Sequence, residues 1–229
     1  MTTAPAVEKD RLPRELIAMR VARELQPGDF VNLGIGIPNL VADFTDPAKG
    51  VIFHAENGLL GIARAQEVGK IEVPDMMNAG NQPVMPIDGA WLMDSAESFA
   101  IVRGGHLDVA VLGGLQVASN GDLANWMRPG RAVGSVGGAA DIAAGARRLF
   151  VAMEHTTKDG EFKIVQQCTY PLTAVGVVKK VFTDIAVLSL DADGFVLEEV
   201  APGWSPEDVQ SQSEARLRIS PDLHEIDLS

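Results

Sequence analysis

The chain has 229 residues, of which 46% are hydrophobic, and it carries a formal net charge of -12 at pH 7. This length and apolar content are enough to bury a sizeable core, and they favour one large domain. The negative charge argues against nucleic acids and anionic membrane surfaces as partners, because both require basic patches. An anionic substrate would depend on backbone N–H groups and helix N-termini, which attract anions whatever the net charge.

A single cysteine, Cys168, excludes an internal disulfide framework and fits a reducing compartment. An isolated cysteine is more often a small buried hydrophobe than a nucleophile. The first residues lack the apolar segment of a signal peptide, and no apolar run reaches the 18 residues typical of a membrane span. We therefore expect a soluble, cytoplasmic protein.

The first predicted elements form a helix followed by a β-turn-α unit. Apolar residues at three- and four-residue steps predict a helix over 11–25. Residues 30–33 are predicted to form a buried strand. A glycine-rich turn then leads into a short helix that ends at Phe44, with Asn39 as its N-cap.

The next strand, predicted at 51–54, leads directly to Glu56. The dipeptide Asn57-Gly58 follows and is a strong turn signal, so the carboxylate is expected at the end of a strand. Ligands bind at strand ends in open α/β sheets. The pattern alone does not establish a function, because a glutamate beside Asn-Gly is most often an exposed, solvated turn residue.

Later segments complete the pattern of a mostly buried α/β sheet. Apolar and largely β-branched runs predict strands at 109–112, 149–153 and 185–190, and the segments 95–102 and 139–147 are predicted helices.

Residues 11–219 are predicted to form one domain, with an open, mostly parallel, twisted sheet covered by helices. Ser205, followed by a proline and two acidic residues, predicts the start of a further helix. Residues 1–10 are predicted as an N-terminal extension. The polar and acidic tail 220–229 is predicted to be poorly ordered.

Motifs of common cofactor and metal enzymes are incomplete. The turn at 34–36 fails the dinucleotide fingerprint because Asn39 stands where the third glycine belongs, and neither a phosphate-binding loop nor a nucleophile elbow is present. No metal site is expected, since the histidines are dispersed. Beside Glu154, a histidine is read as part of a local ion pair or hydrogen bond rather than as catalytic. The histidines are His54, His106, His155 and His224.

Two segments leave a structural and a functional interpretation open. Gly137-Gly138 precedes an alanine-rich helix, so its backbone N–H groups could face developing negative charge, or the pair could be a plain helix-entry turn. Trp126 lies in a predicted loop, where it either stacks on a ligand or anchors the loop to the core.

Seven blocks of sequence in a fixed order are more specific than any one of them. They are NLGIGIPNLVADF at 32–44, HAENGLLG at 54–61, GGHLDVAVLGGLQV at 104–117, GDLANWM at 121–127, GGAADIAAGA at 137–146, MEHTTKDG at 153–160 and FTDIAVL at 182–188. With these blocks the chain resembles the B (beta) subunit of the class I coenzyme A transferases of the 3-oxoacid type, which include the acetoacetate and 3-oxoadipate enzymes. The resemblance extends over roughly residues 11–219.

The resemblance implies that Glu56 is the catalytic nucleophile, since the Ser-Glu-Asn-Gly signature of the family falls on residues 55–58. A carboxylate can attack an acyl-CoA thioester to give a mixed anhydride, and the released CoA thiolate then forms an enzyme-CoA thioester. Asn32 and the backbone at Gly137 and Gly138 are the implied oxyanion and positioning groups.

The resemblance also implies the partners of the reaction. The chain would act with an A (alpha) subunit, as a heterotetramer, and would transfer CoA by a ping-pong route. The expected donor is succinyl-CoA and the expected acceptor a 3-oxoacid such as acetoacetate or 3-oxoadipate. Coenzyme A is then both substrate and covalent intermediate, and no tightly bound cofactor is expected.

Three departures from the family pattern concern the same region. Ala55 replaces a common serine, Ala140 replaces a common methionine, and Gly134-Ser135 stands where Lys-Gly is frequent. Arg128 and Arg131 remain as nearby cations.

Two rival functions are a sugar-phosphate isomerase of similar fold and a non-catalytic binding subunit.

Overall fold

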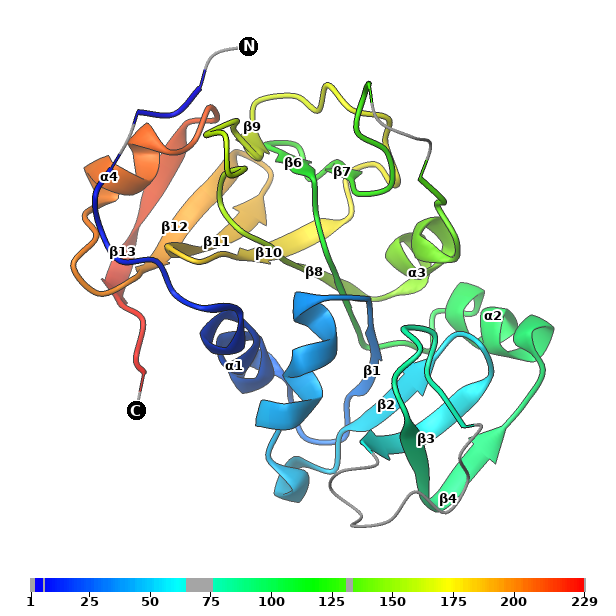
Figure 1. Ribbon diagram of the computed structural model, residues 1–229. Coiled ribbons are helices and arrows are strands. Elements are labelled where there is room, and N and C mark those ends of the chain that lie inside the picture. Colours follow the sequence, from blue (N-terminus) through cyan, green and yellow to red (C-terminus); the bar gives the residue numbers. More distant parts are fainter. Residues whose placement is uncertain (1–2, 6, 65–75, 131–133, 229) are drawn as a thin grey trace.

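The computed structural model describes residues 3–5, 7–64, 76–130 and 134–228 (Figure 1). Five of its strands are parallel neighbours, and further strands extend the same sheet on both sides. The parallel strands are β1 (Phe30–Leu33), β2 (Ile52–Ala55), β5 (Val109–Leu112), β8 (Arg148–Ala152) and β10 (Val178–Phe182), and the flanking strands are β3 (Leu59–Arg64), β4 (Val84–Leu92), β11 (Ala186–Asp191), β12 (Gly194–Val200) and β13 (Leu217–Glu225).

Within the described residues, the sheet has the strand order β13-β12-β11-β10-β8-β5-β1-β2-β3-β4. The pairs from β10 to β2 are parallel, whereas β3 and β4 join one side in antiparallel fashion and β11 and β12 join the other. The predicted α/β class with a mostly parallel sheet is confirmed. A small second sheet has the order β7 (Leu123–Ala124), β6 (Gln116–Ala118), β9 (Ile164–Val165).

Helices cover both faces of the parallel strands (Figure 1). Along β5, Val109 and Val111 pack in a cluster with α1 (Arg14–Glu24) and the 3-10 helix η1 (Ile37–Phe44). Ala110 and Leu112 face the opposite cluster, to which α2 (Ser95–Arg103) and α3 (Ala139–Gly145) contribute. Burial on both faces explains why this strand reads as an unbroken apolar run.

Two short helices complete the described elements. They are the 3-10 helix η2 (Pro47–Lys49) and α4 (Pro206–Ser211). Ser205 caps α4, because its side chain and that of Asp208 form a reciprocal capping box, as the sequence pattern predicted. None of the helices in the described ranges is long and apolar enough to cross a membrane.

The predicted N-cap at Asn39 is wrong. The helix η1 begins at Ile37, its N-cap is Gly36 at φ +90°, and Asn39 is buried within its first turn. Pro38 explains the shift, because proline has no N–H to satisfy and its fixed φ suits the first turn of a helix.

The predicted disorder of the tail is also wrong for its described part. Strand β13 crosses residue 219 and pairs in parallel with β12 through Glu225, and Ile226 is 3% exposed in the cluster beneath α1. Pro221 is tolerated because β13 is an edge strand. The extension at the other end also contacts the domain, since Lys9 forms an ion pair with Asp208.

Candidate active site

Glu56 lies in the three-residue turn that joins β2 to β3. The Gly58 N–H donates to the Ala55 carbonyl over 3.0 Å and closes the turn around Glu56. Gly58 has φ +116°, and a Cβ there would lie 2.1 Å from the Met93 carbonyl oxygen. Only glycine fits this contact, so the Asn-Gly dipeptide has a packing reason as well as a turn preference. The hairpin therefore holds the carboxylate on a defined support.

A cleft of about 550 Å³ brings together the residues that the sequence singled out. Glu56, Asn32, Gly137 and Gly138 all line it. Leu112 at the end of β5 lines the same cleft, so the site lies at the carboxyl ends of parallel strands, where open α/β sheets bind ligands.

Asn32 connects Glu56 to the protein interior. Its Nδ2 lies 3.2 Å from Glu56 Oε2, 3.2 Å from His54 Nδ1 and 3.3 Å from the His54 carbonyl oxygen. The side chain is fully buried, and its Oδ1 has no hydrogen-bond partner within the described residues. The amide therefore presents its N–H groups to the carboxylate.

His54 lies beside Asn32 because β1 and β2 pair in parallel with these two residues as partners. Its Nε2 lies 2.9 Å from Ser98 Oγ in α2. Burial lowers the pKa of His54 to about 4, so the ring is neutral at pH 7. A neutral ring that donates from Nε2 to Ser98 keeps a lone pair on Nδ1 for the Asn32 amide.

The glycine pair forms a helix entry at the rim of the cleft. Gly137 has φ +50°, and its N–H donates to Ser135 Oγ over 3.3 Å. Gly138 is the residue before α3, and a Cβ there would lie 2.6 Å from Phe99 Cζ. Backbone conformation favours glycine at the first position and close packing favours it at the second, and both residues line the cleft with Glu56.

Trp126 lies at the cleft, and its indole is hydrogen-bonded to a neighbouring loop. It lines the cleft, and its Nε1 donates to the Leu172 carbonyl over 3.3 Å. Arg128 forms an ion pair with Glu161, and the predicted neighbour Arg131 lies outside the described residues.

The remaining candidates do not line the cleft. His155 is fully buried between Thr183 and Ser213, and burial with the nearby charges of Arg11 and Lys163 lowers its pKa to about 3. Its hydrogen bonds agree with the structural interpretation. Burial raises the pKa of the Cys168 thiol to about 11, which makes it a poor nucleophile. No cluster that could hold a metal ion occurs among the residues that the structure describes.

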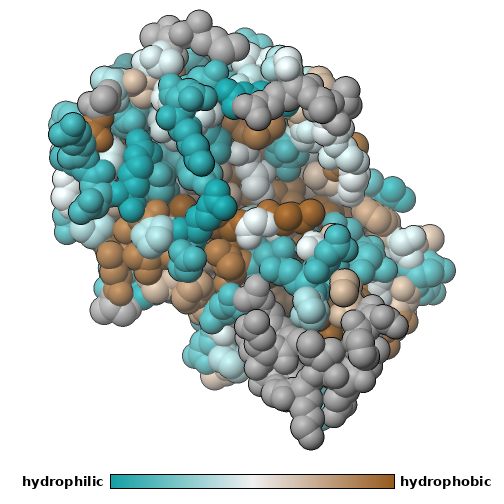
Figure 2. Space-filling model, in the orientation of Figure 1, coloured by the Kyte–Doolittle hydropathy of each residue, from teal (hydrophilic) through white to brown (hydrophobic). Residues whose placement is uncertain are grey.

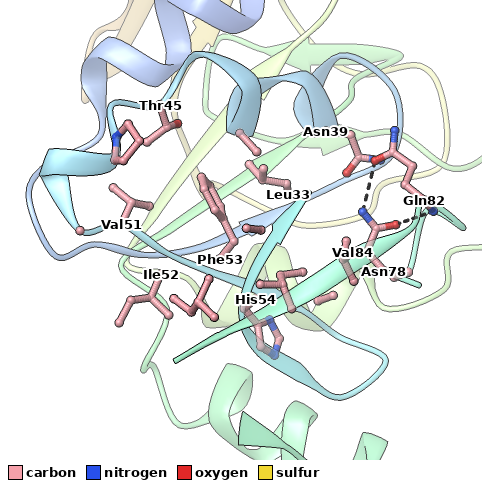
Figure 3. A pocket seen from close by; sticks show the side chains of 18 of the residues that line it. Leu33, Asn39, Thr45, Val51, Ile52, Phe53, His54, Asn78, Gln82 and Val84 are labelled. Atoms are coloured by element: carbon pink, nitrogen blue, oxygen red, sulfur yellow. Dashed lines mark hydrogen bonds between the residues drawn. The ribbon is translucent and has the colours of Figure 1, made fainter. Parts of the chain in front are cut away.

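A second, smaller cavity of about 260 Å³ lies on the η1 side of β2 (Figure 3). Glu56 does not line it, and the imidazole of His54 points away from it. The amides of Asn78 and Gln82 are hydrogen-bonded to each other at its edge, over 3.2 Å. Its lining includes the apolar side chains of Leu33, Phe53, Ile62 and Val84.

The contacts of His54 with Asn32 and Ser98 were not predicted from the sequence. Ser98 is 44 residues from His54, and the contact with Asn32 depends on the register of β1 against β2. The sequence did contain one signal, because Asn32 and His54 are polar residues within predicted strands. Buried polar side chains have hydrogen-bond partners, so a contact between them could have been expected. Ile35 and Val136, which also line the cleft, carried no signal of their own.

Comparisons with known proteins agree with the resemblance in the sequence. A profile of the coenzyme A transferase family matches residues 14–212. The B subunit of the succinyl-CoA:3-ketoacid coenzyme A transferase of Helicobacter pylori is 43% identical over 206 residues, which are 90% of this chain and 99% of the relative. The beta subunit of the acetate CoA-transferase of Escherichia coli is 44% identical over 211 residues, which are 92% of this chain and 96% of that relative.

The fold also occurs in solved structures. An acyl-CoA transferase of Escherichia coli O157:H7 (YdiF), solved as a thioester complex with CoA, superposes with a TM-score of 0.75 at 23% identity. The match covers 97% of this chain but only 44% of that one, so the present chain spans less than half the length of that protein. The family profile and the two relatives cover about nine tenths of the chain, and the chain therefore belongs to the coenzyme A transferase family.

Proposed function

We propose that this chain transfers coenzyme A between carboxylic acids, with Glu56 as the nucleophile and with an A subunit as its partner. The observation that carries the proposal is the placement of the Glu56 carboxylate in a strand-end cleft, with the buried Asn32 amide 3.2 Å away. A rigid turn and a buried donor suit a group that must attack in one fixed direction.

The proposed reaction proceeds through two covalent forms of Glu56. A carboxylate oxygen attacks the thioester carbon of acyl-CoA, and collapse of the tetrahedral intermediate breaks the C–S bond and releases CoA thiolate. The thiolate then attacks the Glu56 carbonyl of the mixed anhydride and expels the donor acid as its carboxylate, which leaves a Glu56-CoA thioester. The acceptor carboxylate attacks this thioester, and the same steps run in reverse.

A carboxylate suits this exchange for an energetic reason. The reaction replaces the thioester of one carboxylic acid by that of another, so a carboxylate nucleophile keeps each step near energetic balance. What the site must supply is positioning and stabilisation of the oxyanion in each tetrahedral intermediate. One preorganised donor is typically worth about 3 kcal/mol. We assign this role to Asn32 and to the backbone of Gly137 and Gly138.

Exposed apolar side chains at the cleft support a partner subunit. Ile35 is 73% exposed and Val136 39% exposed, and both line the cleft. Leu172, whose carbonyl accepts a hydrogen bond from Trp126 Nε1, is 42% exposed. Figure 2 shows hydrophobic residues gathered across the middle of the visible face. An A subunit that covers this rim would exclude water from the cleft, and we propose a heterotetramer.

The acids remain a proposal by analogy. Relatives of nearly equal identity are named for a 3-ketoacid and for acetate. We retain succinyl-CoA as donor and a 3-oxoacid, such as acetoacetate or 3-oxoadipate, as acceptor. Coenzyme A serves as substrate and covalent intermediate, and the single cysteine supports a cytoplasmic location.

The experiment measures exchange of isotope-labelled acid into acyl-CoA by the chain co-expressed with its A subunit. We expect exchange with parallel double-reciprocal plots in the wild type, as in ping-pong kinetics, and no exchange with Glu56→Gln. Isomerisation of a sugar phosphate without acid exchange would support the isomerase instead. Full activity of Glu56→Gln would support a non-catalytic role for this chain.

A further inference from the structure

A continuous set of hydrogen bonds leads from Glu56 into the interior of the protein. Asn32 Nδ2 lies 3.2 Å from Glu56 Oε2 and 3.2 Å from His54 Nδ1. His54 Nε2 in turn lies 2.9 Å from Ser98 Oγ. Asn32 and Ser98 are fully buried and His54 is 2% exposed, so water does not compete for the contacts of His54 with these two side chains.

The two ends of the Asn32 amide have unequal surroundings. Its nitrogen carries two protons and faces three acceptors, which are the Glu56 carboxylate, the His54 ring and the His54 carbonyl oxygen. Its oxygen is buried and has no partner in the part of the chain that the structure describes. Because an unpaired buried oxygen costs free energy, the acceptors at the nitrogen must hold the amide in this orientation.

The two acceptors on His54 persist when the Glu56 carboxylate loses its charge during the reaction. On the proposed function, on which this inference rests, Glu56 becomes an anhydride and then a thioester, and both are uncharged. The charge-assisted attraction for the Asn32 N–H is then lost. His54 Nδ1 and the His54 carbonyl remain as acceptors throughout the cycle.

We propose that His54 is a positioning residue, which keeps the Asn32 amide nitrogen turned toward the Glu56 carbonyl group during the whole reaction. Ser98 accepts the Nε2 proton of His54 and thereby fixes the tautomer that has a lone pair on Nδ1. A donor held in place stabilises the oxyanion of each tetrahedral intermediate. His54 acts only through Asn32 and does not touch the reacting atoms.

The test compares two amide substitutions that replace different ring nitrogens. His54→Asn places an amide oxygen near the position of Nδ1, whereas His54→Gln places its amide near the position of Nε2. Loss of an oxyanion donor typically costs about 10²- to 10³-fold in kcat, so we expect His54→Gln to lose about 10- to 100-fold in kcat. Its KM should change by less than about threefold. His54→Asn should recover most of the loss.

A second readout separates the two halves of the reaction. Rapid quenching followed by mass spectrometry of the chain, in complex with the A subunit, measures formation and discharge of the Glu56-CoA thioester. Discharge begins from an uncharged Glu56, so His54→Gln should slow discharge more than formation. Ser98→Ala removes only the hydrogen-bond partner of His54 Nε2. It should slow both steps less than His54→Gln does, and should again slow discharge more than formation. This variant also provides the test if His54→Gln does not fold.

The control is His224→Gln, which replaces an exposed histidine of β13 and should leave both steps unchanged. Equal activity of His54→Asn and His54→Gln, whether high or low, would overturn the positioning role. So would equal slowing of formation and discharge. Absence of the thioester in the wild-type complex would instead overturn the proposed function, so the two failures are distinguishable.

Discussion

At the residue scale, the proposal depends on where the carboxylate of Glu56 lies and not only on its charge. Glu56→Asp keeps the charge but withdraws the carboxylate by about 1 Å, and a misplacement of this size can cost on the order of a hundredfold in rate. We expect kcat of the complex to fall by about that factor, measured by acid exchange. Near-normal turnover of this variant would argue against nucleophilic attack.

The residues of the site differ in how far sequence could predict them. Glu56 was placed at a strand end by the short apolar run and the Asn-Gly turn, and the structure places it there. The contact of His54 with Asn32 depends on strand register, and that with Ser98 depends on how α2 packs on the sheet. Register and packing follow from tertiary structure, so local patterns do not reveal them.

At the element scale, the β2–β3 hairpin fixes the carboxylate through Gly58. A side chain at Gly58 would collide with the Met93 carbonyl at 2.1 Å, in addition to the strain of φ +116°. Gly28, at φ +79° with nothing within 4 Å of a built Cβ, has the strain alone. Gly28→Ala should therefore cost about 1–2 kcal/mol of unfolding free energy, and Gly58→Ala should cost more and also lower kcat.

Urea unfolding and acid exchange of both variants measure these effects. Equal loss of unfolding free energy in Gly58→Ala and Gly28→Ala would contradict the claim that the close contact with the Met93 carbonyl adds to the cost of a side chain at Gly58. The same comparison separates a local strain from a displaced hairpin, because only the latter moves Glu56.

Buried strands of the sheet were easier to predict from the sequence than exposed ones. Strand β5 is apolar on both faces, so a continuous apolar run indicated it. Strand β4 begins with two buried residues and is mostly exposed beyond them, and strand β13 is mostly exposed and contains Pro221. The second half of β13 is polar and was read as a tail, but its pairing with β12 gives it a regular strand structure.

At the scale of the whole molecule, buried neutral histidines make stability depend on pH. Burial lowers the pKa of His54 to about 4, and burial with nearby positive charges lowers that of His155 to about 3, from about 6.5 in an unfolded chain. Protonation therefore favours the unfolded state. The stabilising effect is complete above about pH 6.5 and declines as the pH falls toward 4, by up to about 1.4 kcal/mol per pH unit for each histidine.

Urea unfolding at pH 7.5, 6.5 and 5.5 measures this dependence. His155→Gln should lower the stability at pH 7.5 but flatten its decline toward pH 5.5. His224→Gln, at an exposed position, should keep the decline of the wild type. Equal slopes for the two variants would contradict the assignment of His155 as a buried neutral group.

The most direct measurement of the central claim is peptide mass spectrometry of the chain, co-expressed with its A subunit and incubated with acyl-CoA. We predict an adduct on Glu56 with the mass of CoA less one water, which disappears when acceptor acid is added. A folded complex that consumes acyl-CoA without any adduct on Glu56 would contradict the proposed mechanism.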